Sequence, residues 1–309
     1  MDYAIDSQNL TRVFGAFTAV DRLTIQIRPG EICGFLGPNG AGKSTAVRML
    51  CGILQPSSGT ATVLGYDLSR DTENIKRNIG YMSQKFSLYE DLSVLANLSF
   101  YAGIYSIPAR QRKARIAEML SLAGIGGRQD SLVEELSVGW KQRLALSCAI
   151  ISRPALVFLD EPTSGVSPTS RREFFNIIQN LSNQGTTVIV TTHFMDEAER
   201  CDRIAFMSEG LLLALDTPDN LKRDTIAGHM VALDLPHPME HLARIEALPF
   251  VSDCSIHGAS MHVVLDQISD QTQTTLQAIT GVQPRPIMPN LEDVFITLAK
   301  KRAKGGPVV

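Results

Sequence analysis

The larger part of the chain shows two hydrophobic patterns, one of alternating apolar and polar positions and one of short apolar runs. The first 30 residues alternate between apolar and polar positions, as half-buried strands do. Residues 155–159 form a continuous apolar run, and short apolar-rich segments at 31–36 and 186–191 are also typical of strands buried on both faces of a parallel sheet. Residues 85–152 are expected to form a mostly helical subdomain, with a glycine-rich turn at 124–127. The order strand, helix, strand, helix predicts an α/β core.

The pattern changes near residue 228. The elements expected beyond it are strand 230–235, helix 239–247, strands 251–256 and 261–265, helix 270–279, strand 283–287 and helix 291–300. The first six follow the β-α-β-β-α-β order of a ferredoxin-like unit. We therefore predict a first domain over residues 1–227, a small α+β domain over 228–300 and a flexible tail over 301–309. The strands of the small domain show no clustered His, Cys or paired acids, so we expect a stabilising dimer contact rather than a ligand site.

Composition and charge exclude several classes of protein. Of 309 residues, 44% are hydrophobic and 20% are charged, which suffices for a sizeable core. A net charge of -3 gives no basic surface for nucleic acid. No stretch reaches the roughly 18 apolar residues of a membrane span, and the acidic start lacks the features of a signal peptide. The five scattered cysteines indicate reduced thiols in the cytosol.

A glycine-rich segment after the run 31–36 matches the P-loop pattern G-x-x-x-x-G-K-[ST]. Its glycines let backbone N–H groups converge on phosphate oxygens, and the helix that follows directs its positive end at the same anion. We expect Lys43 to reach the β- and γ-phosphates and the Ser44 hydroxyl to bind Mg²⁺. The predicted nucleotide-binding residues are Gly37, Pro38, Asn39, Gly40, Ala41, Gly42, Lys43, Ser44 and Thr45.

An acidic pair follows the apolar run 155–159. Asp160 and Glu161 come at the carboxyl end of a buried strand, where the ligands of open α/β sheets collect. We expect Asp160 to hold Mg²⁺ through water and Glu161 to polarise an attacking water as a general base. An apolar run that ends in acids is common, but combined with the P-loop it predicts a P-loop NTPase.

With these motifs in order, residues 5–225 resemble the ATP-binding subunits of ABC transporters. The resemblance implies an ATPase cassette that binds ATP and Mg²⁺ and pairs with a second cassette. Phe14, 23 residues before the P-loop, matches the aromatic residue that stacks on adenine, and a core phenylalanine is an equal alternative. Gln84 matches the Q-loop glutamine, and the resemblance implies that it acts in catalysis and at the Mg²⁺ site, beside the attacking water. His193 matches the switch histidine that contacts the γ-phosphate.

Residues 136–143 resemble the L-S-G-G-Q signature of the same family. In the family, this helix start contacts the γ-phosphate of ATP held by the opposite subunit. Ser137, a favourable N-cap, and Gly139 remain for that contact. The departures from the family pattern are Val138 for a glycine, Trp140 for the glutamine and Ser167 for the aspartate of the D-loop. The last departure leads us to expect slower hydrolysis or weaker coupling between the two sites.

The segment from Lys85 to Val94 resembles bacterial ABC-2-type exporters, including daunorubicin-resistance-type ATPases. This implies that region 85–135 contacts a separate ABC-2-type permease and that the second cassette is an identical chain or a paralogue. It also implies export of drugs or other small molecules, from the cytoplasmic face of the plasma membrane. The alternatives are an importer ATPase and a non-transport ABC protein acting on ribosomes or DNA. The single cassette, the lack of long insertions and the lack of a basic patch count against the last one.

Overall fold

The computed structural model describes residues 2–85 and 87–303. The chain divides between Leu215 and Asp216 into two compact units. The division precedes the predicted end of the first domain at residue 227 because helix α8 (Pro218–Asp224) packs against α11 (Leu291–Ala303) of the second unit. Residues 301–303, predicted to begin a tail, belong to α11, and the rest of that predicted tail lies outside the described residues.

The first unit contains two sheets. An antiparallel sheet has the order β2-β1-β4-β5 and consists of β1 (Ile5–Phe14), β2 (Phe17–Ile27), β4 (Ser58–Val63) and β5 (Tyr66–Asp67). The second sheet has the order β10-β9-β3-β8-β7-β6 and consists of β3 (Ile32–Leu36), β6 (Ile79–Met82), β7 (Leu156–Asp160), β8 (Thr187–Thr192), β9 (Arg203–Ser208) and β10 (Leu211–Asp216). Its pairs from β9 to β6 are parallel, which confirms the predicted α/β core.

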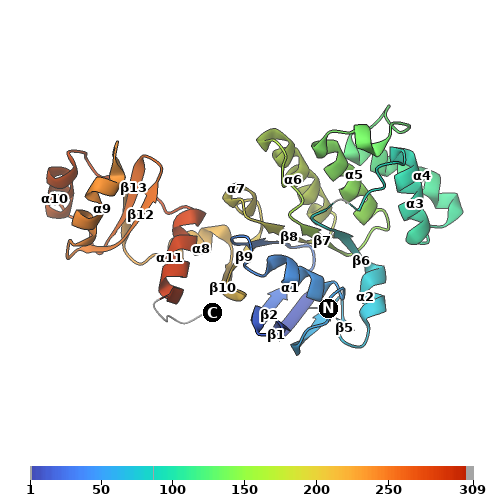
Figure 1. Ribbon diagram of the computed structural model, residues 1–309, viewed down its shortest axis with the longest axis horizontal. Helices are drawn as coiled ribbons and strands as arrows, with labels where there is room; N and C mark the ends of the chain where they lie inside the picture. Colours follow the sequence, from blue (N-terminus) through green and yellow to red (C-terminus); the bar gives the residue numbers. More distant parts are fainter. Residues whose placement is uncertain (1, 86, 304–309) are drawn as a thin grey trace. The chain divides into compact units, whose positions relative to one another are not determined.

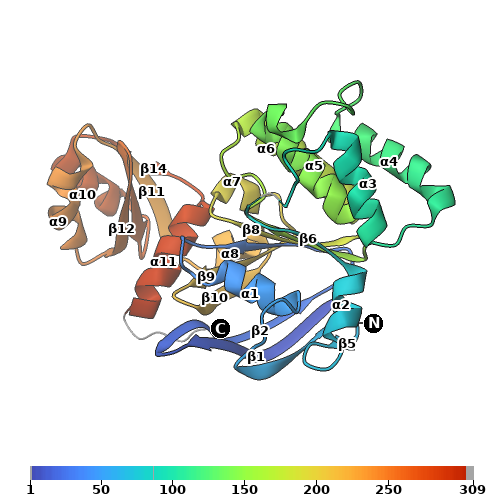
Figure 2. The same ribbon diagram turned by 45° about the vertical axis from the view of Figure 1, so that its right-hand side comes forward.

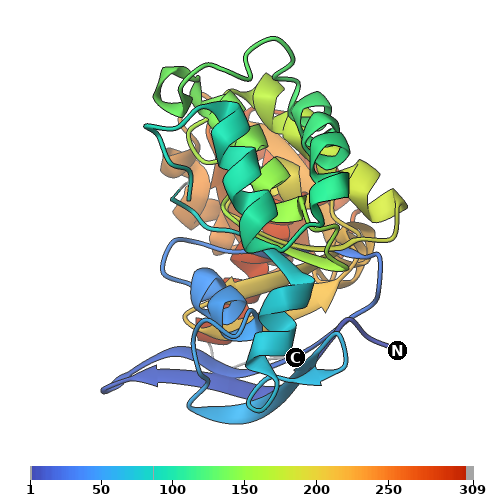
Figure 3. The ribbon, with the colours of Figure 1, turned by 90° about the vertical axis from the view of Figure 1, so that its right-hand side faces the viewer.

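Helices cover both faces of the six-stranded sheet (Figures 1 and 2). One face carries α3 (Val94–Ile104), α4 (Ala109–Ala123), a 3₁₀ turn (Val133–Glu135), α5 (Val138–Ile150) and α6 (Pro168–Asn183). The other face carries α1 (Lys43–Leu50), with α2 (Thr72–Asn78) at the edge strand β6. The short α7 (Met195–Ala198) follows β8. Figure 3 shows the helices of residues 94–150 in green on one side and the antiparallel sheet in blue on the other.

Alternation along the strands explains these layers. Val157 and Leu159 of β7 enter the core beneath the helical subdomain. Leu156 and Phe158 enter a second core, between α1 and the antiparallel sheet. Both pairs are fully buried, because a strand with apolar residues at every position must be covered on both faces. The continuous apolar run in the sequence is therefore the cause of the two-sided packing.

The second unit contains one antiparallel sheet with the order β12-β13-β11-β14. Its elements after α8 are β11 (His229–Asp234), α9 (Pro238–Glu246), β12 (Val251–His257), β13 (Ser260–Leu265), α10 (Asp270–Thr280), β14 (Arg285–Pro286) and α11. Figure 2 shows α9 and α10 on one side of this sheet and α11 on the other. The core between the sheet and α9 and α10 includes Val231, Leu233, Val263 and Leu276.

Two further observations concern the chain as a whole. All five cysteines are buried and free, as the sequence predicted. Burial raises the thiol pKa of each one, and that of Cys254 rises to about 12. Within the described residues, no helix is both long and apolar enough to cross a membrane.

Candidate functional site

The P-loop connects the carboxyl end of β3 to α1, and two of its glycines fit because they lack a side chain. A Cβ at Gly37 would lie 2.0 Å from the Met207 carbonyl oxygen. A Cβ at Gly42 would lie 2.4 Å from the Ala19 carbonyl oxygen, and Gly42 has a left-handed φ of 97°. The backbone therefore passes too close to its neighbours for any larger residue. The helix begins at Lys43, directly after this turn.

Lys43 is buried within the loop that it terminates. Its side chain is 3% exposed, and Nζ donates hydrogen bonds to the carbonyl oxygens of Gly37 at 2.7 Å and Pro38 at 3.0 Å. Nζ also lies 4.0 Å from Glu161 Oε1. Burial lowers the pKa of Lys43, while the nearby Glu161 and Asp160 act in the opposite direction. An anion such as phosphate would compensate the cost of burying this ammonium group.

Asp160 joins the P-loop to the neighbouring strands. Its Oδ1 accepts hydrogen bonds from the hydroxyls of Ser44 and Thr191, both at 2.8 Å. Its Oδ2 is buried and has no hydrogen-bond partner among the described residues. A buried carboxylate oxygen without a partner is costly, and a hard cation such as Mg²⁺ satisfies it. Ser44 and Asp160, two of the residues predicted to bind magnesium, therefore fit a Mg²⁺ ion.

Glu161 is positioned by an unusual backbone conformation. It has a left-handed φ of 47°, which is strained for a residue with a Cβ, and its N–H donates to Thr191 Oγ1 at 2.8 Å. Its Oε2 accepts from Gln84 Nε2 at 2.9 Å and lies 3.9 Å from His193 Nδ1. The Nδ1 atom of His193 has no hydrogen-bond partner among the described residues. The three residues predicted to be catalytic thus lie together, with polar atoms available to a ligand.

The sheet order explains this convergence. β3, β8, β7 and β6 are consecutive neighbours, and the P-loop, His193, Asp160 with Glu161, and Gln84 follow their respective carboxyl ends. Four segments that are distant in sequence therefore meet along one edge of a parallel sheet, as expected for a ligand site in an open α/β fold.

Thr191 is a site residue that the sequence analysis missed. It contacts both members of the acidic pair, by donating to Asp160 and accepting from the Glu161 N–H. Glu197 was missed as well: it is buried and accepts hydrogen bonds from the hydroxyls of Thr163 and Thr192. Burial raises the pKa of Glu197, against these hydrogen bonds. The sequence feature that could have revealed these contacts is the run of threonines at the end of the 186–191 strand, next to His193.

The signature residues lie apart from this cluster. Ser137 is the N-cap residue of α5, but its side chain makes no capping hydrogen bond, contrary to what a favourable cap suggests. Gly139 approaches α6, since a Cβ there would lie 3.4 Å from Ser170 Oγ. Trp140 packs against the core of the helical subdomain, with the Arg128 guanidinium 4.3 Å from its ring centroid. Trp140 is therefore accommodated by packing.

Phe14 lies at the end of β1. It is 46% exposed, and the Arg12 guanidinium lies 4.4 Å from its ring centroid. The alternative of a core phenylalanine is therefore wrong, because a core side chain would be covered. Ser167 is the N-cap of α6 and accepts a hydrogen bond from the Ser170 N–H at 3.3 Å.

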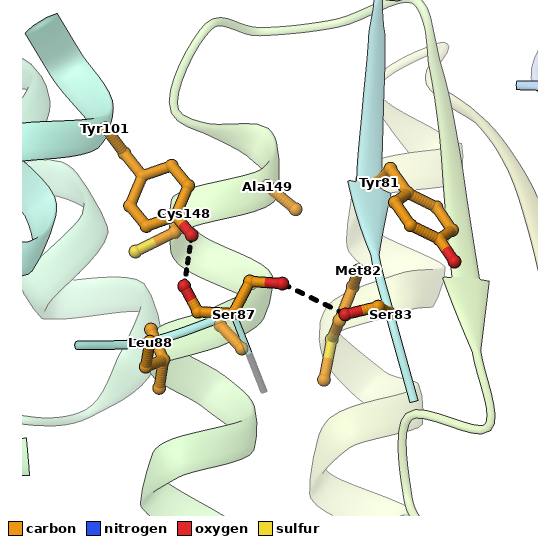
Figure 4. A pocket seen from close by; sticks show the side chains of 9 residues that line it. Tyr81, Met82, Ser83, Ser87, Leu88, Tyr101, Cys148 and Ala149 are labelled. Carbon is orange, nitrogen blue, oxygen red and sulfur yellow. Dashed lines mark hydrogen bonds between the residues drawn. The ribbon is translucent and has the colours of Figure 1, made fainter. Parts of the chain in front are cut away.

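A small cavity lies beside the segment that follows β6 (Figure 4). Its volume is about 20 Å³, enough for a water molecule and far too small for a nucleotide. The Tyr101 hydroxyl of α3 donates to the Ser87 carbonyl oxygen, and the Ser83 and Ser87 hydroxyls lie 3.0 Å apart. Burial raises the pKa of Tyr101 to about 12, so its hydroxyl remains a donor. These contacts connect the segment around Gln84 to the helical subdomain.

The second unit contradicts the expectation that its strands carry no cluster of chemical groups. Ligand atoms of His257, His262 and Asp293 all lie within 4.8 Å of one another. The expectation was wrong because His257 of β12 and His262 of β13 meet across the hairpin, and the aspartate comes from α11, packed on the same face.

The fold and the site of the first unit define a P-loop nucleotide-binding cassette. The family described as "ABC transporter" matches residues 20–164. The Nod factor export ATP-binding protein I of Rhizobium etli is 34% identical over 298 residues, which cover 96% of this chain and 93% of that protein. This chain therefore belongs to the ATP-binding proteins of ABC transporters, as its motifs predicted.

Two further proteins show how far the similarity extends. The probable multidrug ABC transporter ATP-binding protein YbhF of Escherichia coli K12 is 49% identical over 218 residues, or 71% of this chain, but this region spans only 38% of YbhF. Among solved structures, CbiO1 from Clostridium perfringens matches with a TM-score of 0.67 and 28% identity, over 72% of this chain and 92% of CbiO1. The cassette fold is thus shared.

Proposed function

We propose that this chain binds and hydrolyses ATP and thereby powers a separate membrane permease that exports small molecules. The observation that carries the proposal is the convergence of Lys43, Asp160, Glu161, Gln84 and His193 along one edge of the parallel sheet. These residues offer a cation for phosphate, a carboxylate for a metal, a general base and two polar groups beside the base. This is the set that phosphoryl transfer to water requires.

Each side chain has a defined task in this mechanism. The P-loop N–H groups and Lys43 bind the phosphates, and Ser44 and Asp160 hold Mg²⁺. When bound, Mg²⁺ neutralises charge on the β- and γ-phosphates. Glu161 accepts a proton from the attacking water, while Gln84 orients the Glu161 carboxylate through its 2.9 Å hydrogen bond. His193 contacts the γ-phosphate, and the exposed ring of Phe14 stacks on adenine.

A second cassette completes the site. The side chain of Ser137 makes no capping hydrogen bond, so its hydroxyl and the first N–H groups of α5 are available to an anion. Gln142 of the same helix donates to the Ser164 carbonyl oxygen at 3.1 Å, which links the signature helix to the loop after Glu161. We infer that Ser137 and Gly139 contact the γ-phosphate of ATP bound to a second copy of this chain or to a paralogue.

An apolar surface on α3 supports permease binding. Leu95, Phe100 and Ile104 of α3 are exposed by 38%, 40% and 58% respectively, and Tyr89, which precedes α3 and whose ring contacts Phe100, is exposed by 44%. Exposed apolar groups in this part of the helical subdomain favour a partner that covers them. The relatives are named for multidrug transport and Nod factor export, which favours an ABC-2-type exporter permease at the inner face of the plasma membrane.

The ATPase proposal is tested by the Glu161→Gln variant. Loss of the general base should lower ATP turnover by about 100-fold to 10,000-fold while ATP binding is retained. Glu240→Gln, an exposed glutamate on α9, is the matched control and should turn over ATP at the wild-type rate. Equal turnover of Glu161→Gln and wild type would refute this assignment.

The transport proposal is tested by a detergent pull-down of the tagged chain from its native cells with ATP and Mg²⁺. Mass spectrometry should identify a stoichiometric multi-spanning membrane protein. If ribosomal proteins or DNA were the main partners, the ATPase proposal would stand and the transport proposal would be refuted. Replacing Phe100 and Ile104 by serine should reduce recovery of the membrane protein, with no change in ATP binding.

A further inference from the structure

Two histidines share one face of the β12–β13 hairpin in the second unit. Ser255 lies opposite His262, and His257 lies opposite Ser260. Because alternate residues of a strand share a face, both histidines lie on the same side and are diagonal neighbours. Their rings stack, with centroids 4.1 Å apart. The other face of the hairpin enters the apolar core through Cys254 and Met261.

The start of α11 supplies a buried carboxylate to this face. Asn290 and Asp293 cap the helix reciprocally: Asn290 Oδ1 accepts the Asp293 N–H at 2.9 Å, and Asp293 Oδ2 accepts the Asn290 N–H at 3.0 Å. This leaves Asp293 Oδ1, which lies 2.8 Å from both His257 Nε2 and His262 Nδ1. The Asp293 side chain is only 1% exposed. One carboxylate oxygen thus faces two ring nitrogens.

The Ser255 hydroxyl also reaches this cluster, at 3.0 Å from His257 Nε2 and 3.4 Å from Asp293 Oδ1. His257 lies between two carboxylates, with Nε2 at Asp293 and Nδ1 at 3.4 Å from Glu292 Oε2. In either neutral tautomer, one of these carboxylates faces a nitrogen lone pair. Charging both histidines would place two cations in stacked rings 4.1 Å apart. One positive charge in this cluster satisfies these contacts, and a metal ion between Asp293 and the two rings would supply it.

We propose that His257 Nε2, His262 Nδ1 and Asp293 Oδ1 bind a divalent transition-metal ion. Glu292 then accepts the Nδ1–H of His257, the arrangement in which a carboxylate orients a metal-binding imidazole. The Asn290 N–H holds Asp293 Oδ2, so that Oδ1 alone faces the ion. This site lies in the second unit and does not depend on the proposed ATPase activity.

The ligand set selects the class of metal. Two imidazole nitrogens and one carboxylate suit Zn²⁺, Co²⁺, Ni²⁺ or Fe²⁺, whereas Mg²⁺ and Ca²⁺ prefer oxygen ligands throughout. Bonds of about 2.0 to 2.2 Å place tetrahedral ligands about 3.3 Å apart, so the three groups must separate by about half an ångström. Both histidine side chains are 12% exposed, which gives an ion access from solvent.

The ion would bridge the β12–β13 hairpin and α11. These elements already meet through Lys300, whose Nζ contacts Asp253 Oδ1 at 2.6 Å and the Cys254 carbonyl oxygen at 2.8 Å. Because the ion binds the folded second unit and not the unfolded chain, metal binding stabilises the folded state by mass action. The expected readout is a melting temperature that rises with metal concentration.

The test titrates the full chain, without nucleotide or Mg²⁺, with Co²⁺ and Zn²⁺. We expect a single equivalent of Co²⁺ to give the visible absorption of nitrogen and oxygen ligands, without thiolate charge transfer, and Zn²⁺ to displace it. His257→Asn and His262→Asn should each abolish stoichiometric binding. Glu292→Gln, at a side chain 57% exposed, should weaken binding by about 10-fold to 100-fold without disturbing the fold.

Two controls make the result decisive. His229→Asn, an exposed histidine at the start of β11, should bind as the wild type does. Asp160→Asn tests binding at the nucleotide site and should also leave the cobalt spectrum unchanged. Stoichiometric binding that survives in the His257→Asn/His262→Asn double variant, or that disappears in Asp160→Asn, would overturn the proposal. So would wild-type protein that neither binds Co²⁺ nor gains melting temperature with Zn²⁺.

Discussion

Two aspartates, Asp160 in the first unit and Asp293 in the second, are equally buried but have different neighbours. Oδ1 of Asp160 accepts hydrogen bonds from two hydroxyls at 2.8 Å, and its Oδ2 has no hydrogen-bond partner in the described part of the chain. Oδ1 of Asp293 lies 2.8 Å from two imidazole nitrogens, and its Oδ2 accepts the Asn290 N–H. Each carboxylate keeps one oxygen directed at a cluster of polar groups.

The difference teaches that the neighbours of a carboxylate decide which ion it suits. Around Asp160 the other donors are hydroxyl oxygens, which suit Mg²⁺ and the phosphates that accompany it. Around Asp293 they are nitrogens, which suit transition metals. The two sites should therefore respond independently to metals and to substitutions.

Exchanging each aspartate for asparagine is the strongest test of this comparison. In Asp160→Asn, Mg²⁺-dependent ATP turnover should fall by about 100-fold or more, because metal stabilisation of phosphoryl transfer is worth several kcal/mol. The cobalt spectrum of the second unit should persist in that variant and be lost in Asp293→Asn. Turnover against Mg²⁺ concentration and Co²⁺ absorption measure the two effects. Loss of both properties in either variant would mean that the sites are not independent.

Thr191 tests how far the geometry around Asp160 depends on a neighbouring strand. Thr191→Val removes one hydrogen bond to Asp160 and leaves the Glu161 N–H without its acceptor. We expect a loss of about 1–3 kcal/mol in the free energy of unfolding and a turnover about 10-fold lower. Thr191→Ser retains the hydroxyl and should restore most of both. Denaturant melts and steady-state turnover measure these changes, and a fully active Thr191→Val would exclude a positioning role.

High pH should distinguish the units through their cysteines. Burial raises the pKa of four thiols in the first unit and of Cys254, to about 12, in the second. Above about pH 8.5 the unfolded chain loses thiol protons that the folded chain keeps, so stability falls as pH rises, by up to about 1.4 kcal/mol per pH unit for each thiol. Below that pH the thiols contribute no slope.

Thermal melts between pH 8 and pH 11 should therefore show that the stability of the first unit falls more steeply with pH than that of the second unit. Replacing Cys254 by alanine should flatten the pH dependence of the second unit only. If stability fell equally steeply with pH in both units, the thiols would not be the cause of the pH dependence.

Ser167→Asp is expected to have the smallest effect. The residue caps α6, and aspartate caps a helix as well as serine does, so the melting temperature should stay within a few degrees of wild type. Because the family has aspartate at this place, turnover should rise modestly. An unchanged or lower turnover would contradict the D-loop interpretation of Ser167.

The fold was predictable where local patterns decide it. The apolar runs that became β3, β7 and β8 predicted buried parallel strands, because such runs need cover on both faces. The boundary between the units was predicted too late, because α8 packs with α11 and no local pattern of residues 216–227 reveals this. The predicted order of elements after residue 228 agrees with β11 to α11.

The sequence by itself determined the phosphate-binding segment, since a P-loop binds phosphate with the backbone of one continuous stretch and needs glycines at fixed positions. It also determined Asp160 and Glu161, which end a recognisable strand. Only the tertiary structure decided that Thr191 supports both acids, and that His257 and His262 meet Asp293. Those contacts join residues that are 30 to 36 positions apart and lie on separate elements. Strand register and helix packing create them, and neither is encoded in the spacing of the residues concerned.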